Sequence, residues 1–137
     1  MKMLNGVKRW LDTFLVPTNE DYGNIPKDRY ELRYELMKEE NEEYLQACKD
    51  DNQVEILDAL TDKMFVLLGT YLEHGVSETL LKESFKEVLN SNFSKLENGK
   101  PLFRSDGKIL KGKGYFKPNL KGSTSQNCLS KFFTIAT

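Results

Sequence analysis

The stretch between Asn52 and His74 constrains the fold most, because it combines an almost continuous apolar surface with a line of acidic side chains. Glu55, Asp58 and Asp62 recur at spacings of three and four residues, which places them on one face of an α-helix. The other faces are apolar almost all round, so we expect a central, buried helix whose carboxylates cannot all avoid the interior. Burying unpaired carboxylates costs several kcal/mol, which indicates a compensating positive charge. The apolar positions are Ile56, Leu57, Leu60, Met64, Val66, Leu67 and Leu68.

The preceding helix, predicted from about residue 28 to residue 49, turns acidic halfway along the face that should meet its neighbour. A connection of about five residues joins the two helices, so they should form an antiparallel hairpin. That pairing places Glu40 and Glu43 opposite Glu55 and Asp58. The stripe on the preceding helix consists of Leu32, Leu36, Glu39 or Glu40, Glu43 and Ala47.

An all-oxygen cluster of this kind suits a hard divalent cation such as Mg²⁺ or Mn²⁺. Zinc would favour His or Cys ligands, and the chain has one histidine, His74. Di-iron helical sites recurrently use Glu-x-x-His, whereas the fourth position here is Glu43 or Asp58. The competing interpretation is a solvated charge run in which acidic side chains pair with nearby bases. Its members would be Glu39, Glu40, Glu42 and Glu43 with Arg33, Lys38 and Lys49.

Two further helices and a C-terminal segment complete the predicted fold. Apolar residues at helical spacing predict a first helix over about residues 3–15, and a fourth helix is expected from Ser77 to about Asn92. Turn dipeptides then flank two short apolar runs, residues 101–103 and 109–110, which could pair as a small hairpin. We therefore predict an all-α bundle of four to five helices with a short irregular or hairpin C-terminal segment.

The length and composition fit one domain of an ordinary globular protein. The chain has 137 residues, of which 39% are hydrophobic and 30% charged. We assign the domain to residues 1–120, with residues 121–137 as a C-terminal tail that is either docked or disordered. Two cysteines, Cys48 and Cys128, are too few and too distant for a disulfide framework. With no apolar run long enough for a signal or a membrane span, a cytoplasmic location is expected.

Charge is divided unevenly along the chain. Residues 1–94 carry 11 basic against 19 acidic side chains, whereas residues 95–121 carry 8 basic against 2 acidic ones. One interpretation is an ordinary Lys-rich loop beside Glu-rich helices. The sharper interpretation is that the acidic part collects a cation while the basic part meets phosphates. The basic residues show no aromatic stacking pattern, so nucleic-acid binding is disfavoured.

Several short motifs resemble the all-α nucleoside-triphosphate pyrophosphohydrolases, which include MazG, the dimeric dUTPases and the phosphoribosyl-ATP pyrophosphohydrolases. One motif is Glu-Glu-x-x-Glu at residues 39–43, followed after a gap by Glu-x-x-Asp at residues 55–58 and a further Asp62. Four segments resemble the sequences of the MazG-like branch. They are residues 36–47, residues 58–62, Asn-Phe-Ser-Lys at 92–95 and residues 111–118. The similarity covers about residues 7–120.

The resemblance implies a role for each matching residue. Glu39 would orient or deprotonate the attacking water. The metal ligands would be Glu40, Glu43, Glu55 and Asp58, with Asp62 as an accessory ligand or as a hydrogen-bond acceptor around the direct ligands. The nucleotide would meet Asn92, Lys95, Lys111 and Tyr115, and Lys95 is the best candidate for a phosphate contact.

The expected activity is Mg²⁺-dependent cleavage of a nucleoside triphosphate between its α and β phosphates, giving a monophosphate and pyrophosphate. Two alternatives remain open. One is the same chemistry on phosphoribosyl-ATP, and the other is a catalytically silent helical module that dimerises or binds a partner. A homodimer or homotetramer is expected, because the helices offer more apolar surface than one core can cover.

Overall fold

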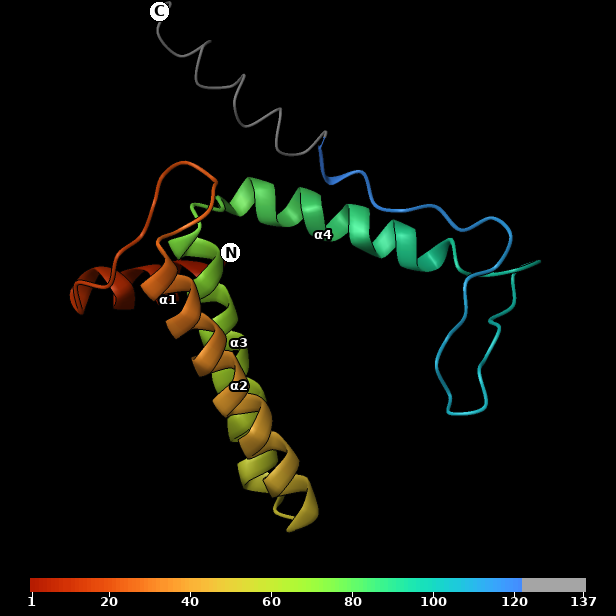
Figure 1. Ribbon diagram of the computed structural model, residues 1–137, viewed down its shortest axis with the longest axis horizontal. Helices are drawn as coiled ribbons and strands as arrows, with labels where there is room; N and C mark the ends of the chain where they lie inside the picture. The colour runs from red at the N-terminus through yellow and green to blue at the C-terminus, as the bar shows by residue number, and fades with distance from the viewer. Residues whose placement is uncertain (122–137) are drawn as a thin grey trace, which may run out of the picture. The chain divides into compact units, whose positions relative to one another are not determined.

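A computed structural model describes residues 1–121, and the tail predicted at residues 121–137 lies outside them apart from its first residue. The predicted all-α class is confirmed, since the regular elements of the described residues are helices (Figure 1). The chain divides into two compact units, the first Met1–Glu78 and the second beginning at Thr79. The helices are α1 (Lys2–Thr13), α2 (Lys27–Lys49), α3 (Gln53–Glu73) and α4 (Glu78–Phe93).

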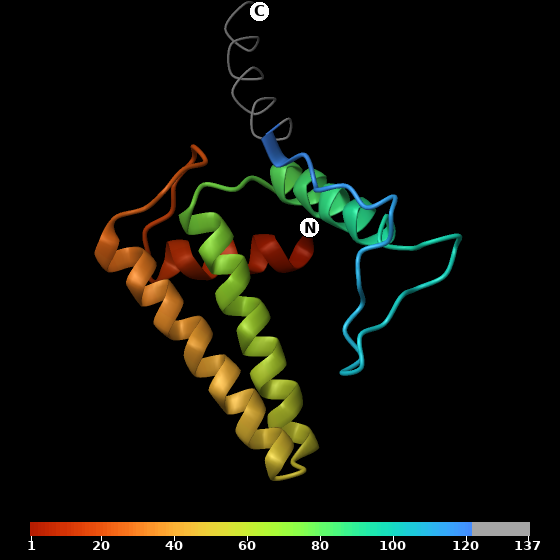
Figure 2. The same cartoon turned by 45° about the vertical axis from the view of Figure 1, so that its right-hand side comes forward.

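The first unit is built on the predicted antiparallel hairpin, with α2 and α3 side by side along their length (Figures 1 and 2). The Asn52 side chain caps α3 by accepting a hydrogen bond from the backbone N–H of Glu55 at 3.3 Å. Gly75 follows the last turn of α3 with φ +75°, a conformation that favours glycine. Ala47 and Ala59 are both buried, and their small side chains suit a close approach of the two helices.

Helix α1 crosses the open end of this hairpin and packs on α3 (Figure 2). Its buried side chains are Leu4, Val7 and Leu11, which recur at helical spacing. The Trp10 ring meets the Phe65 ring edge-on, with 5.1 Å between their centroids. The larger buried side chains of the unit therefore lie at the open end of the hairpin, and Ala47 and Ala59 continue the core toward the α2–α3 turn.

The expectation that α3 is buried all round is wrong for the single chain. Val66 and Leu68 are buried, but a stripe of five aliphatic side chains is exposed, with Leu57 at 67%. Glu55, Asp58 and Asp62 are exposed as well. The physical reason is that α1 and α2 together cover only part of the circumference of α3. The stripe, here called the α3 apolar face, comprises Val54, Leu57, Leu60, Met64 and Leu67.

The second unit contains α4 and a segment that makes the two predicted turns. Asn98 and Gly99 both have positive φ, and Glu97 and Lys100 exchange backbone hydrogen bonds of 2.9 Å across them. This is the geometry that Asn-Gly favours in tight hairpins. The predicted pairing of residues 101–103 with residues 109–110 is confirmed by a bridge between Phe103 and Ile109.

Within residues 1–121, no helix has both the length and the apolar character needed to cross a membrane.

Candidate active site

Glu40 belongs to the group of carboxylates on the α2–α3 hairpin that is here called the acidic surface. Its members are Glu39, Glu40, Glu43, Glu55, Asp58 and Asp62. The side chain of Glu40 is half-buried, and its Oε2 atom is shielded from solvent with no hydrogen-bond partner within the described residues. A buried carboxylate oxygen without a donor is costly. Among the described residues, the Oε2 atom of Glu40 is the one buried side-chain polar atom without a hydrogen-bond partner.

The pKa of Glu40 is raised, first because burial disfavours its charged form and then because four other carboxylates repel that charge. Carboxylates of both α2 and α3 therefore act on Glu40. The four carboxylates belong to Glu43, Asp62, Glu39 and Asp58.

Glu55 joins the surface one turn further toward the connection between the helices. It lines a shallow cavity of about 310 Å³ together with Glu43, Gln46 and Asp50. All six predicted carboxylates thus lie on the α2–α3 hairpin, although five of them are exposed rather than interior. Among the described residues, no three carboxylates are already close enough to enclose a metal ion.

A second cavity, of about 250 Å³, includes Glu40 in its lining. Trp10, Leu36 and Phe65 supply apolar surface to it, and Arg33, Glu40 and Asp62 supply charged groups. It lies between α1, α2 and α3, so a ligand there would touch both the aromatic side chains and the acidic surface. This is the part of the hairpin where an apolar group can come next to carboxylates.

The competing interpretation, a solvated charge run, holds for part of α2. Lys38 pairs with Glu35 at 3.9 Å and with Glu42 at 4.0 Å, and these side chains are exposed. Lys63 donates to the Asn41 side chain. Arg33, which that interpretation assigned to the glutamates, is instead buried against Glu73 and backbone atoms of α3.

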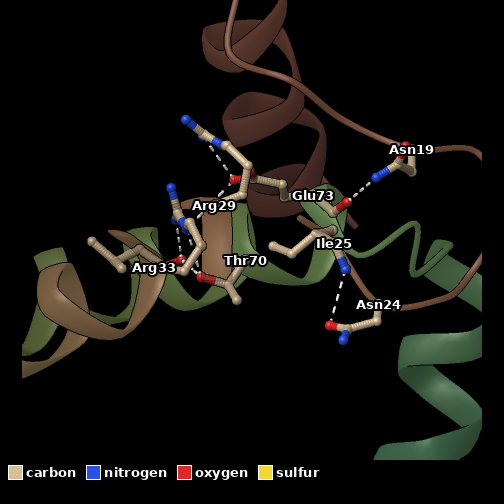
Figure 3. Close-up of polar contacts among 8 residues, drawn as sticks. Asn19, Asn24, Ile25, Arg29, Arg33, Thr70 and Glu73 are labelled. Atoms are coloured by element: carbon tan, nitrogen blue, oxygen red, sulfur yellow. Dashed lines mark hydrogen bonds and ion pairs between the residues drawn. The ribbon is translucent and has the colours of Figure 1, made fainter. Parts of the chain in front are cut away.

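The sequence reasoning missed a buried ion cluster at the open end of the hairpin (Figure 3). Glu73, at 1% exposure, accepts from Arg29 Nε at 2.5 Å, and Arg33 Nε lies 3.7 Å from its other oxygen. Arg33 also donates to Thr70 Oγ1 at 2.9 Å and to the Val66 carbonyl at 2.7 Å. Burial lowers the pKa of Arg33, and the Glu73 charge opposes that shift.

The ion cluster accounts for two features of the residues around it. Gly69 lies against the Arg33 guanidinium, and a Cβ there would come within 2.9 Å of it. Asn19 donates to the Glu73 carbonyl at 2.7 Å, which attaches the connector before α2 to the end of α3. The cluster thus fixes the relative placement of α2 and α3, on which the acidic surface depends. A glutamate at the end of an apolar helix, with two arginines one turn apart on the previous helix, was the available signal.

The predicted nucleotide-binding residues all lie in the second unit. Lys95 Nζ donates to the Asn92 side chain at 2.6 Å, and Lys111 Nζ lies 4.5 Å from the centre of the Tyr115 ring. The backbone N–H of Gly112 donates to the Lys95 carbonyl at 2.9 Å. The structure therefore joins the two lysine-bearing segments through the backbone.

A family model described as phosphoribosyl-ATP pyrophosphohydrolase matches residues 7–92, which is more than half of the chain. The chain belongs to the phosphoribosyl-ATP pyrophosphohydrolase family. The matched region spans the whole α2–α3 hairpin and ends at Asn92, one residue before the end of α4. The search of curated proteins found no match.

Membership of this family places the chain in the superfamily of all-α nucleoside-triphosphate pyrophosphohydrolases, as the motifs indicated. The protein is a nucleotide pyrophosphohydrolase, a hydrolase that acts on phosphoric anhydrides. Lys95, Lys111 and Tyr115 lie beyond the matched residues, so the family match carries no information about them.

Proposed function

We propose that this pyrophosphohydrolase acts on a nucleoside triphosphate, in the manner of the MazG-like branch, and releases a nucleoside monophosphate and pyrophosphate. The observation that carries the proposal is the convergence of five carboxylates, Glu40 and the four that repel it, on a hairpin that the family match covers. The basic segment beyond residue 92, with its similarity to the MazG-like branch, supports the choice of substrate.

The residues of the acidic surface fit Mg²⁺, or Mn²⁺, in their chemistry. They offer only oxygen donors, which is the preference of hard divalent ions. The buried Oε2 atom of Glu40 lacks a partner within the described residues, and a cation would supply one. We propose Glu40, Glu43, Glu55 and Asp58 as ligands, with Asp62 as an accessory ligand. The bound ion would offset the negative charge of the phosphates against these carboxylates.

Glu39 is proposed as the general base. It is exposed on α2 next to Glu40 and contributes to the repulsion felt there, so it lies at the acidic surface. In this role it would accept the proton that water loses as its oxygen bonds to phosphorus and the anhydride bond breaks. Asn92, Lys95, Lys111 and Tyr115 are proposed to contact the nucleotide, with the lysines meeting phosphate oxygens.

Phosphoribosyl-ATP is the second candidate substrate, and the family match is the observation that favours it. It carries a triphosphate, so the same carboxylates would serve both reactions. The cavity that Trp10, Phe65 and Glu40 line is where we expect the two substrates to be distinguished, because it combines aromatic surface with carboxylates of the acidic surface.

One assay distinguishes these alternatives. The purified full chain is incubated with each ribonucleoside and deoxyribonucleoside triphosphate and with phosphoribosyl-ATP, with Mg²⁺ or Mn²⁺, and both products are quantified. Release of a monophosphate and pyrophosphate in equal amounts from a nucleoside triphosphate would support the proposal. Preferential turnover of phosphoribosyl-ATP would favour the second candidate, and no turnover of any of these compounds would contradict both substrate assignments.

We further propose that the chain forms a homodimer or a homotetramer and works in the cytoplasm. The exposed α3 apolar face supports self-association, since contiguous aliphatic stripes are rarely left uncovered. The exposed free thiol of Cys48 is in keeping with a reducing compartment.

A further inference from the structure

The segment after α4 folds back onto the end of that helix through two serines. Ser91 is buried, and its hydroxyl donates to the Phe116 carbonyl at 2.8 Å. The Ser94 hydroxyl accepts from the Phe116 N–H at 3.1 Å and donates to the Ser91 carbonyl at 2.7 Å. Both backbone groups of Phe116 are therefore held by side chains that come from the last turn of α4 and the residue after it.

Gly112 makes the second attachment, and only glycine fits there. Its N–H donates to the Lys95 carbonyl at 2.9 Å, and the residue is buried. A Cβ at this position would lie 2.8 Å from the Lys95 carbonyl oxygen and 2.9 Å from that of Leu96. Real Cβ atoms do not approach backbone so closely, so any side chain would push the segments apart.

These attachments decide where two lysines lie. Lys95 carries the carbonyl that accepts the hydrogen bond, and Lys111 directly precedes the glycine that donates it. Each ammonium group is then oriented by a neighbour, Lys95 by Asn92 and Lys111 by the Tyr115 ring. The segment from residue 95 to residue 121, with 8 basic and 2 acidic side chains, is thus folded rather than a loose loop at this point.

We propose that Ser94 and Gly112 are positioning residues for the polyphosphate group of the substrate. They keep the backbone segments that carry Lys95 and Lys111 attached to each other. Both ammonium groups can then contact the phosphate oxygens at the same time. Neither Ser94 nor Gly112 touches the substrate. The identity of the substrate rests on the proposed function, whereas the recognition of a polyphosphate rests on the two lysines that the attachment joins and on the basic excess of residues 95–121.

The chain offers a matched control two residues away. In Lys111-Gly112-Lys113-Gly114, both glycines lack positive φ, but a Cβ at Gly114 meets nothing within 4 Å. Gly112→Ala and Gly114→Ala therefore change the unfolded chain equally and differ in whether the attachment survives. The full chain and both variants are titrated with inorganic tripolyphosphate by calorimetry, while amide exchange at position 112 and at Phe116 reports on the attachment.

We expect Gly112→Ala to weaken tripolyphosphate binding roughly tenfold, the effect of losing one charge-assisted phosphate contact. Gly114→Ala should bind as the unchanged chain does. Equal affinities of the two variants, with faster amide exchange in Gly112→Ala alone, would overturn the proposal. So would the absence of tripolyphosphate binding by the unchanged chain.

Ser94 gives an independent test with a conservative rescue. Ser94→Ala removes the hydroxyl that accepts from Phe116, and Ser94→Thr keeps it. With the nucleotide that the chain hydrolyses best, Ser94→Ala should raise KM and leave kcat within about twofold, and Ser94→Thr should restore KM. A fall in kcat without a change in KM would contradict a positioning role. If the chain releases no pyrophosphate but Gly112→Ala still loses tripolyphosphate binding, the proposed function fails and this inference stands.

Discussion

At the scale of single residues, Glu40 combines burial with repulsion. The neighbouring carboxylates on α2 and α3 are exposed, so water screens their charges, but the Oε2 atom of Glu40 is shielded from solvent. The folded chain therefore holds this carboxyl in an environment that opposes its ionisation, so that its charged form reduces the stability of the fold. Function-bearing positions are often maintained at such a cost.

The first prediction concerns Glu40→Gln in metal-free buffer. Because the pKa of Glu40 is raised on folding, the folded chain binds more protons than the unfolded one, and its stability falls as pH rises from about 4, the usual value, through the raised pKa. Glutamine removes that charge, so the variant should melt a few degrees higher near neutral pH and show a flatter pH dependence. Thermal unfolding with a chelator, from about pH 4 to about pH 7, measures both. If the variant kept the pH dependence of the unchanged chain, the pKa of Glu40 would not be raised on folding.

The second prediction concerns Glu43→Gln and Asp58→Asn, one on each helix. Both side chains are exposed, so neither substitution should unfold the chain. If they are ligands, turnover should fall by roughly 100-fold or more, because an oxygen donor to the ion is lost. The stabilisation of the unchanged chain by added Mg²⁺ should shrink in parallel. Glu42→Gln is the control, since Glu42 pairs with Lys38 and lies outside the carboxylates that act on Glu40. Full activity in both variants would remove these residues from the site.

At the scale of the elements, periodicity and end signals were sufficient to predict the helices. The Asn52 cap, the glycine after α3 and the Asn98-Gly99 turn are local features, because each depends on residues within a few positions. The facing of the acidic residues also followed from local information, namely helical spacing and a short connection. What could not be predicted was the depth of burial, since it depends on how much of α3 the other helices cover.

The Arg29–Glu73–Arg33 cluster shows the same limit. Glu73 and Arg29 are 44 residues apart in the chain, and their pairing depends on the register of α2 against α3. From the sequence, Arg33 was as reasonable a partner for the α2 glutamates as for any other acid. The structure pairs Arg33 with Glu73, because Glu73 is the acidic residue, among those described, that is buried together with Arg33.

The third prediction tests that cluster through Glu73→Gln. The change keeps the shape of the side chain but leaves Arg33 buried without its counter-charge, which should lower the free energy of unfolding by roughly 3 kcal/mol. Urea unfolding followed by circular dichroism gives the value. Asp12→Asn is the control, because it breaks the exposed Lys8–Asp12 pair and should cost about 0.5 kcal/mol or less. Similar losses in the two variants would mean that the cluster contributes no more than a surface pair.

At the scale of the whole molecule, the uncovered aliphatic side chains of α3 connect stability with function. The α3 apolar face lies on the helix that also carries Glu55, Asp58 and Asp62, so a partner that covers the face also restrains these carboxylates. Another copy of the chain is the partner we propose, since a symmetric pairing would bury the face on both copies at once.

The fourth prediction is that Leu60→Lys combined with Leu67→Lys converts the oligomer to a monomer. Both side chains are exposed in the single chain, at 48% and 43%, so the substitutions should not disturb its own core. In the assembly they would bury two ammonium groups per copy without counter-charges, which dissociates the copies. Light scattering coupled to size exclusion measures the mass, and circular dichroism checks that the helices persist.

Leu15→Lys is the control, because Leu15 is 88% exposed and lies outside the α3 apolar face, and it should leave the mass unchanged. An unchanged chain that is already monomeric at micromolar concentration would contradict the proposed assembly, and a double variant that keeps the oligomeric mass would place the contact elsewhere.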